Sequence, residues 1–264
     1  MTTLLRSIED PTPHAVGRWN LGEVAMHLSQ AWLVVPGLAR RDLSRAREIL
    51  PHLVGDSLIE DMGDLGETTV LGVSSDPERN PSVLADRIEA RAHEYLSECA
   101  GADPDAPRPW LVHGVTVRRS TLTYHLLNET VMHGSDIARA AGRAWSIEPA
   151  HAAMVWGRFI VPVLQALDPR ALVDPDRAAG LRVTYDVRIR GGDRFHFIFT
   201  DGMLRIEDPS LGPVDCHLSA DPVAMLRVTW NRQSQWSAIA QGKLLPWGRK
   251  PWLGPRFRAL MRNP

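Results

Sequence analysis

The sequence predicts a two-domain chain of the α plus α/β class, with an antiparallel four-helix bundle followed by an α+β domain whose sheet is mainly antiparallel. Two observations predict it. Apolar residues recur at helical spacing through the first part of the chain, and from Leu181 they alternate with polar residues at the two-residue period of a strand. Residues 168–180 between these parts are rich in proline and charge. We therefore expect a helical domain over residues 1–167 and a second domain over residues 180–264.

Composition limits the classes of partner. The chain has 264 residues, 44% of them hydrophobic, and 30 Lys and Arg residues balance 31 Asp and Glu residues, so no overall field attracts nucleic acid or an anionic membrane. Cys99 and Cys216 lie far apart and outside any metal or redox spacing pattern. No apolar run approaches the ~18 residues that span a bilayer. We expect a cytoplasmic monomer or homodimer that acts on small molecules.

The most informative motif lies in a predicted helix from Leu122 to its glycine stop at Gly142. Residues four apart lie on one face of a helix, so His125, Glu129 and His133 form a single polar column. A carboxylate flanked by two imidazoles is a set of potential metal ligands, but Glu/His pairs at this spacing are also common on helix surfaces. The column therefore indicates either a metal site or an ordinary polar face.

A second predicted helix favours the metal interpretation. Asn20 is placed to cap this helix, and Glu23, three residues later, can bond back to it. His27 then lies two turns into the helix, on its apolar side with Val24 and Leu28. A buried histidine needs a polar partner, and the Glu/His column of the other helix can supply one.

These residues carry a family resemblance. The pattern Trp-x-Leu-x-Glu-Val-x-x-His-Leu begins at Trp19, and the pattern Leu-Asn-Glu-x-x-x-His-Gly-x-Asp-Ile-Ala-Arg-Ala-x-Gly ends at Gly142. Together they resemble the metal-binding domain of mycothiol-dependent maleylpyruvate isomerases, within the DinB-like helical bundles, over roughly the first two-thirds of the chain. The resemblance implies a divalent metal, usually zinc, held by His27, Glu129 and His133.

Other polar residues of the motif are expected around these ligands. Asp136 can orient His133, because metal-bound histidines commonly donate their second nitrogen to an acceptor, or it can form an ordinary ion pair with Arg139. His125 is outside the family's ligand set, and we expect it behind the ligands, facing the substrate or in a structural role. Arg139 is a candidate for binding the thiol cosubstrate.

The ligand set predicts a catalytic metal. Two imidazoles and one carboxylate suit Zn²⁺ or another first-row ion and leave a coordination position open. The sequence contains no Gly-x-Ser-x-Gly or other nucleophile motif, so the resemblance implies that mycothiol attacks a small electrophilic substrate, with isomerisation or S-transfer as the outcome. Arg188 and Arg190 are candidate anchors for a substrate carboxylate. The alternative is a non-catalytic binding or regulatory protein, favoured if His125 or His113 closes the site as a fourth ligand.

The remaining helices of the first domain follow from apolar spacing and from breakers. We expect one helix over residues 82–101 with a serine cap, and another over residues 149–167 with a kink at Pro162. Small and β-branched residues predict a loop over residues 66–81, which could line the site.

In the second domain, alternation predicts four antiparallel strands, then two helices and a closing terminal helix. The expected strands are 181–190, 195–200, 203–207 and 214–219, and the expected helices begin at residues 221 and 234. This order is similar to that of the sterol-carrier-protein-like domain that often follows this metal-binding domain.

Overall fold

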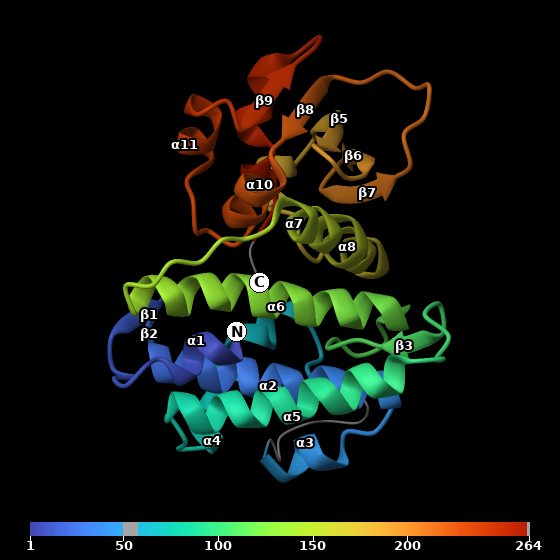
Figure 1. Cartoon of the computed structure of the whole chain (residues 1–264). Coiled ribbons are helices and arrows are strands. Elements are labelled where there is room, and N and C mark those ends of the chain that lie inside the picture. The colour runs from blue at the N-terminus through green and yellow to red at the C-terminus, as the bar shows by residue number, and fades with distance from the viewer. Residues whose placement is uncertain (50–57, 263–264) are drawn as a thin grey trace. The chain divides into compact units, whose positions relative to one another are not determined.

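The computed structural model describes residues 1–49 and 58–262, and the chain divides into two compact units, Met1–Ile147 and Glu148–Pro264 (Figure 1). The division lies before the helical segment 149–166, which the sequence assigns to the first domain. In the structure this segment belongs to the second unit, because Trp156 packs against Phe197 of the sheet at a ring-centroid distance of 6.5 Å. Its apolar face is therefore buried by strands rather than by the bundle.

The first unit is built around three long helices, of which α2 contacts both of the others. Their bounds are α2 Leu21–Arg40, α5 Pro81–Cys99 and α6 Arg119–Ala140. Shorter elements are α1 Thr2–Arg6, α3 Ser44–Ile49, η1 Met62–Asp64, α4 Leu65–Ser75 and the strand pairs β1 His14–Val16 with β2 Trp19–Asn20 and β3 Pro107–Pro109 with β4 Thr116–Arg118. Among the described residues, no helix combines the length and apolar character that a membrane span requires.

The prediction of a loop over residues 66–81 is wrong for most of that range, because the helix α4 occupies Leu65–Ser75. Its glycines and β-branched residues have low helix propensity, which explains the prediction. However, Val73 is buried in the core with Leu28, and Gln30 of α2 donates a hydrogen bond of 2.6 Å to the carbonyl of Gly72. Burial against α2 outweighs local propensity here.

The predicted capping box of α2 is confirmed. Glu23 N donates to Asn20 Oδ1 at 2.9 Å, and Asn20 N donates to Glu23 Oε2 at 2.8 Å. At α5 the cap is Asn80 rather than the predicted Ser82, because Asn80 Oδ1 accepts from Ser82 N at 3.0 Å and Pro81 occupies the first turn.

We predict that Asn20→Ala costs about 1 kcal/mol of stability, because the substitution leaves a helix-terminal N–H without its acceptor. Urea unfolding followed by far-ultraviolet circular dichroism measures this change. Asn20→Asp keeps the acceptor and is the matched control, with an expected change of a few tenths of a kcal/mol. Equal stability of the alanine and aspartate variants would show that the cap does not contribute.

The second unit contains a five-stranded sheet in the order β7-β6-β5-β8-β9 (Figure 1). The strands are β5 Arg182–Ile189, β6 Arg194–Thr200, β7 Met203–Glu207, β8 Cys216–Ala220 and β9 Leu244–Trp247. The sequence predicts the first four, but β8 runs parallel to β5 rather than antiparallel. The fifth strand is missed because Pro246 lies inside it, which is tolerated since β9 is an edge strand.

Helices cover one face of this sheet, where the aromatic core lies. Tyr185, Phe197 and Phe199 are fully buried, and Phe257 packs on Tyr185 and Phe197 with ring centroids 5.1 and 5.2 Å apart. The helices of this unit are α7 Pro149–Val155, α8 Val161–Ala166, α9 Pro175–Ala178, α10 Pro222–Thr229 and α11 Gln235–Ala240. The expected terminal helix is replaced by 3-10 turns at Pro251–Arg256 and Arg258–Leu260.

The segment 149–166 is interrupted where a proline kink is predicted. A π-helical turn, Trp156–Ile160, separates α7 from α8, and Pro162 lies in the first turn of α8. Because proline lacks an N–H, the wider turn before it is a common way to accommodate the missing hydrogen bond.

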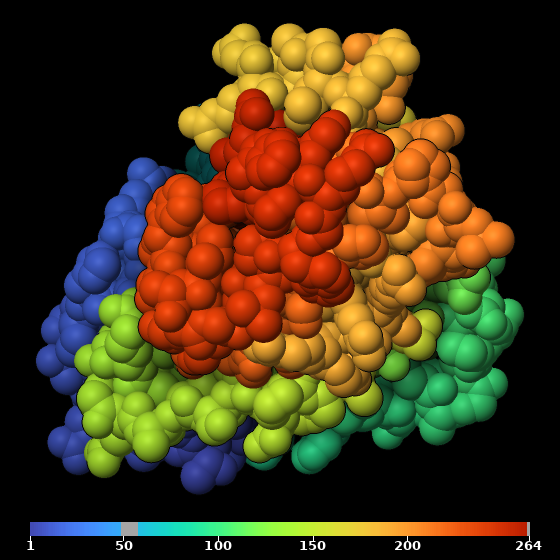
Figure 2. Space-filling model, turned by 90° about the horizontal axis from the view of Figure 1, so that it is seen from above, coloured from blue at the N-terminus to red at the C-terminus, as the bar shows by residue number. Residues whose placement is uncertain are grey.

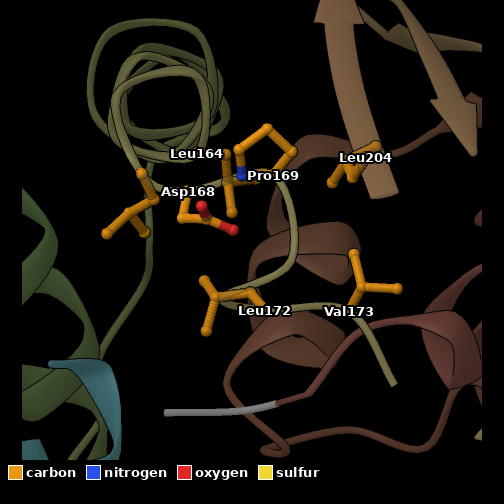
Figure 3. A pocket seen from close by; sticks show the side chains of 7 residues that line it. Leu164, Asp168, Pro169, Leu172, Val173 and Leu204 are labelled. Atoms are coloured by element: carbon orange, nitrogen blue, oxygen red, sulfur yellow. The ribbon is translucent and has the colours of Figure 1, made fainter. Parts of the chain in front are cut away.

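A small cavity lies beside α8 and β7 (Figure 3). Leu164, Leu172 and Leu204 line it together with Asp168, and its volume is about 10 Å³. This is the space of about one water molecule, so the cavity holds no substrate or cofactor.

The other face of the sheet is polar and centres on Asp186, which is buried. Arg194 donates to both carboxylate oxygens at 2.6 and 2.8 Å, and His217 Nδ1 lies 2.5 Å from Oδ2. Burial raises the pKa of Asp186, but the hydrogen bonds from Arg194 and His217 outweigh it, so the pKa lies below its ordinary value of 3.8.

This lowered pKa predicts acid sensitivity. A carboxyl whose pKa is lower in the folded state stabilises the fold above its unfolded value of 3.8, and that stability is lost as the pH falls through the folded value. We expect Asp186→Asn to be less stable at neutral pH and to show a flatter decline below about pH 4 in pH-dependent urea unfolding. Asp208→Asn, at an exposed carboxyl, is the control. Parallel acid declines in Asp186→Asn and the natural protein would contradict this.

Candidate metal centre

Three side chains converge between two helices of the first unit. His27 Nε2 of α2 lies 3.1 Å from Glu129 Oε2 of α6, and His133 Nε2 lies 3.3 Å from the same oxygen. One potential ligand atom from each residue lies within 4.8 Å of the other two. The described residues thus bring together the three side chains that the sequence predicts as a set, and the cluster includes neither His125 nor His113.

Packing of α2 against α6 creates this convergence. On α6, the four-residue spacing aligns Glu129 and His133 on successive turns, as the sequence predicts. On α2, His27 faces α6, and its ring meets that of His133 edge to face at a centroid distance of 4.8 Å. Gly134 beside this site leaves room for the ring of Trp145, which a side chain at that position would strike. This close approach explains the glycine inside an otherwise regular helix.

The two oxygens of Glu129 have different partners. Oε2 faces His27 and His133, whereas Oε1 accepts a hydrogen bond of 3.2 Å from Asn128 Nδ2 and lies 3.5 Å from His125 Nε2. Asn128 is missing from the residues predicted for the site. The Leu-Asn-Glu motif contains it, and its place next to Glu129 was the available signal.

Asp136 lies behind His133. Its Oδ2 is 3.3 Å from His133 Nδ1, and its Oδ1 is 4.0 Å from Arg139. Asp136 therefore lies near both of its predicted partners, although the contact with His133 Nδ1 does not have hydrogen-bond geometry. Arg139 also donates to the backbone carbonyl of Ala15, although 62% of its side chain remains exposed.

Burial and mutual hydrogen bonding set the charges of the cluster. Burial raises the pKa of Glu129, but contacts with His125, His133 and His27 outweigh it and hold this pKa well below 4.5. Burial lowers the pKa of His133, whereas Asp136 and Glu129 raise it to about 9. Burial dominates at His27 and lowers its pKa. The arrangement favours an ionised Glu129 beside a His133 ring protonated on both nitrogens, and a bound cation would displace the additional proton.

Arg188 and Arg190, the predicted substrate anchors, lie in the second unit. Arg190 donates to the carbonyls of Gly242 and Lys243 at 3.4 and 3.2 Å and lies 3.8 Å from Asp221, so it ties the sheet to the segment before β9. The side chain of Arg188 is exposed, and its guanidinium makes no hydrogen bond or ion pair within the described residues. Of these two arginines, Arg188 is the one whose guanidinium is available to a ligand.

The chain is similar to several known proteins. A family model described as the mycothiol maleylpyruvate isomerase N-terminal domain matches residues 5–138. The chain is similar to the crystal structure of a mycothiol-dependent maleylpyruvate isomerase, with 13% identity over 93% of this chain and 86% of the other and a TM-score of 0.49. It is also similar to a UbiJ-SCP2 ubiquinone synthesis protein, with 20% identity over 33% of this chain and 72% of the other and a TM-score of 0.27. No curated protein matches the chain.

The matched segment spans more than half of the sequence and contains His27, Glu129 and His133. It also contains both motifs on which the resemblance rests, except for the last three fixed positions, Arg139, Ala140 and Gly142. The chain therefore belongs to the family of the mycothiol maleylpyruvate isomerase N-terminal domain.

Proposed function

We propose that this protein is a zinc-dependent enzyme that activates mycothiol as a thiolate for attack on a small electrophile, with His27, Glu129 and His133 as the metal ligands. The convergence of these three ligand atoms carries the proposal. Ligand atoms about 2.0–2.1 Å from a tetrahedral zinc ion lie about 3.3 Å from one another. The separations of 3.1 and 3.3 Å from Glu129 Oε2 to the two histidines match this value. These two separations support a zinc ion at this site, and all three ligand atoms lie within 4.8 Å of one another.

A bound zinc ion would supply a Lewis acid that lowers the pKa of a thiol toward neutrality. The chain's own residues prepare the site for it. His133 Nδ1 faces Asp136, which favours the tautomer with Nε2 unprotonated and available as a ligand once the extra proton has left. Asn128 and His125 hold Glu129 Oε1, so that Oε2 is presented to the histidines.

The thiol is proposed to come from outside the chain. Cys216 belongs to the second unit and is fully buried, which raises its pKa to about 11 and makes it a poor nucleophile at neutral pH. Cys99 is the last residue of α5 and is not part of the cluster. Mycothiol, named by the family, fills the role, and the exposed guanidinium of Arg139 is proposed to contact it.

The reaction has two possible outcomes that differ in the fate of the new bond. The thiolate sulfur bonds to an electrophilic carbon of the substrate. In an isomerisation the carbon is part of a double bond conjugated to a carbonyl, and the π electron pair moves onto that carbonyl as the C–S bond forms. After rotation about the resulting single bond the pair returns, the C–S bond breaks and the thiolate leaves. In an S-transfer the bond persists, and a leaving group departs with its electron pair or a proton is taken up.

We further propose that α2, α4, α5 and α6 form a DinB-like four-helix bundle and that the second unit is sterol-carrier-protein-like.

The roles of the residues around Glu129 predict a graded loss of metal affinity. We expect Asn128→Ala and His125→Ala each to weaken zinc binding about 10–100-fold, because each releases the orienting contact on Oε1 and neither removes a ligand. Competition with a chromophoric chelator measures this. A loss for His125→Ala as large as that for His133→Ala would instead make His125 a ligand.

Metal analysis and product analysis test the proposal together. The purified protein should contain one zinc ion per chain, and mass spectrometry should detect an isomer or conjugate when mycothiol is supplied with a panel of unsaturated and halogenated electrophiles. Omitting mycothiol or treating with a chelator should abolish the product. Bound zinc with no product from any electrophile would favour the alternative, a non-catalytic metal-binding protein.

A further inference from the structure

We propose that the polar face of the sheet in the second unit carries a second functional centre, in which His217, oriented by Asp186, is a general base for hydrolysis of a small acyl compound whose carboxylate binds Arg188. This centre is separate from the metal cluster in its residues and its chemistry. The proposal does not depend on the function proposed for the first unit.

The strand register assembles the centre. Asp186 of β5 is paired with His196 of β6 on one side and with His217 of β8 on the other, and His217 is paired with Trp247 of β9. Residues paired in this way point to the same face, so the four side chains form one row across the sheet. Figure 2 shows the C-terminal segment that includes β9, in red, at the surface of the second unit.

The ring of His217 is held on three sides. Its Nδ1 lies 2.5 Å from Asp186 Oδ2, and its face stacks on Trp247 with centroids 5.1 Å apart and an interplanar angle of 18°. Gly248 packs so closely that an added Cβ would lie 2.7 Å from His217 Cδ2. The carboxylate of Asp186 accepts the Nδ1 hydrogen, which leaves the lone pair of the neutral ring on Nε2.

Nε2 is the one polar atom of this ring that remains available. It makes no hydrogen bond within the described residues and is not among their buried unpartnered atoms, and 28% of the His217 side chain is exposed. Asp186 behind it is almost fully buried. A shielded carboxylate that fixes the tautomer of an accessible imidazole is the arrangement that supports general-base catalysis in hydrolases, because it also stabilises the imidazolium that forms.

A purely structural role is the competing explanation, in which His217 merely satisfies a buried carboxylate. Arg194 already does so, since it donates to both oxygens of Asp186 and neutralises its charge. His196 adds a further polar group, for its Nε2 is buried without a hydrogen-bond partner in the described chain and lies 3.8 Å from Asp186 Oδ1. The row therefore contains more polar groups than a structural ion pair requires.

Arg188 defines the class of substrate. It lies two residues after Asp186 on the same face of β5 and is paired with Ser219, two residues after His217. With strands about 4.8 Å apart and a rise of about 3.3 Å per residue, Arg188 and His217 are diagonal neighbours about 8 Å apart at the backbone. Its unpaired guanidinium suits a carboxylate. An ester or similar acyl compound with a carboxylate a few bonds from its carbonyl fits both groups.

The chemical step is a hydrolysis with balanced atoms. His217 Nε2 takes a proton from water while the water oxygen bonds to the carbonyl carbon of the ester. The bond from that carbon to the leaving oxygen then breaks, and the oxygen keeps the electron pair. The imidazolium, paired with Asp186, returns the proton to the leaving oxygen, so the products are a carboxylic acid and an alcohol.

Two chromogenic esters, 4-nitrophenyl acetate and mono-4-nitrophenyl glutarate, test the proposal on the full-length protein. We expect hydrolysis of both above the buffer rate, and a loss of about 100-fold or more of this excess rate in His217→Ala. Arg188→Ala should raise KM for the glutarate ester about 10-fold or more and leave the acetate ester unaffected. His151→Ala, an exposed histidine of α7 in the same unit, is the matched control and should hydrolyse both esters at the natural rate.

Two further measurements separate catalysis from folding and from the metal. His217→Gln can still donate a hydrogen bond to Asp186 but cannot accept a proton, so it should unfold at nearly the natural temperature and yet lack hydrolysis. Treatment with 1,10-phenanthroline should leave the hydrolysis intact, because no metal takes part. Full activity of either His217 variant, or loss of activity with the chelator, would overturn the proposal, as would a natural protein no faster than buffer.

Discussion

Glu129→Gln is expected to weaken zinc binding on the order of 100-fold or more while the helices remain folded. The substitution keeps the size of the side chain but removes its negative charge, and it presents an amide to His27 and His133 where an ionised oxygen now lies. Structural zinc sites in peptides bind with about 10–16 kcal/mol, so loss of one ligand among a few removes several kcal/mol. Chelator competition and metal analysis of the purified variant measure the effect.

The controls for this prediction come from the same unit. Glu67→Gln alters an exposed glutamate of α4 and should bind zinc like the natural protein. His133→Ala removes the neighbouring ligand and should lose metal to a similar degree as Glu129→Gln. Natural zinc content in His133→Ala would reject the ligand assignment, and far-ultraviolet circular dichroism of both variants would separate loss of a ligand from loss of the fold.

Phe197→Ala is expected to destabilise the second unit by about 3–5 kcal/mol. Phe197 is fully buried and lies between Trp156 of the π-helical turn and Phe257, so its removal leaves a cavity that both neighbours border. Such a loss is a large fraction of the stability of an ordinary domain. Thermal unfolding monitored by tryptophan fluorescence should show an earlier transition.

The matched control is Trp252→Ala, because 66% of Trp252 is exposed. Its effect should stay within about 0.5 kcal/mol. The zinc content of Phe197→Ala should be unchanged, since each compact unit has its own core. A change of less than about 1 kcal/mol in Phe197→Ala would contradict the packing described here.

Local features of this protein were predictable from the sequence because they depend on neighbours in the chain. The column on α6 follows from a four-residue spacing, and the capping box of α2 from Asn20 and Glu23 three residues apart. The two-residue alternation after Leu181 identified β5 and β6 for the same reason. His27 was indicated as a partner of the column by its place on the apolar side of α2, and its assignment as a ligand came from the family resemblance.

Other features were decided by contacts between segments that are distant in sequence. The helix α4 forms despite weak propensity because α2 buries Val73, and the segment 149–166 belongs to the second unit because Trp156 packs on the sheet. His217 and Asp186 are 31 residues apart, and only the parallel pairing of β8 with β5 makes them neighbours. Periodicity specifies which face of an element is apolar, but burial against a partner, which periodicity does not identify, decides where that face packs.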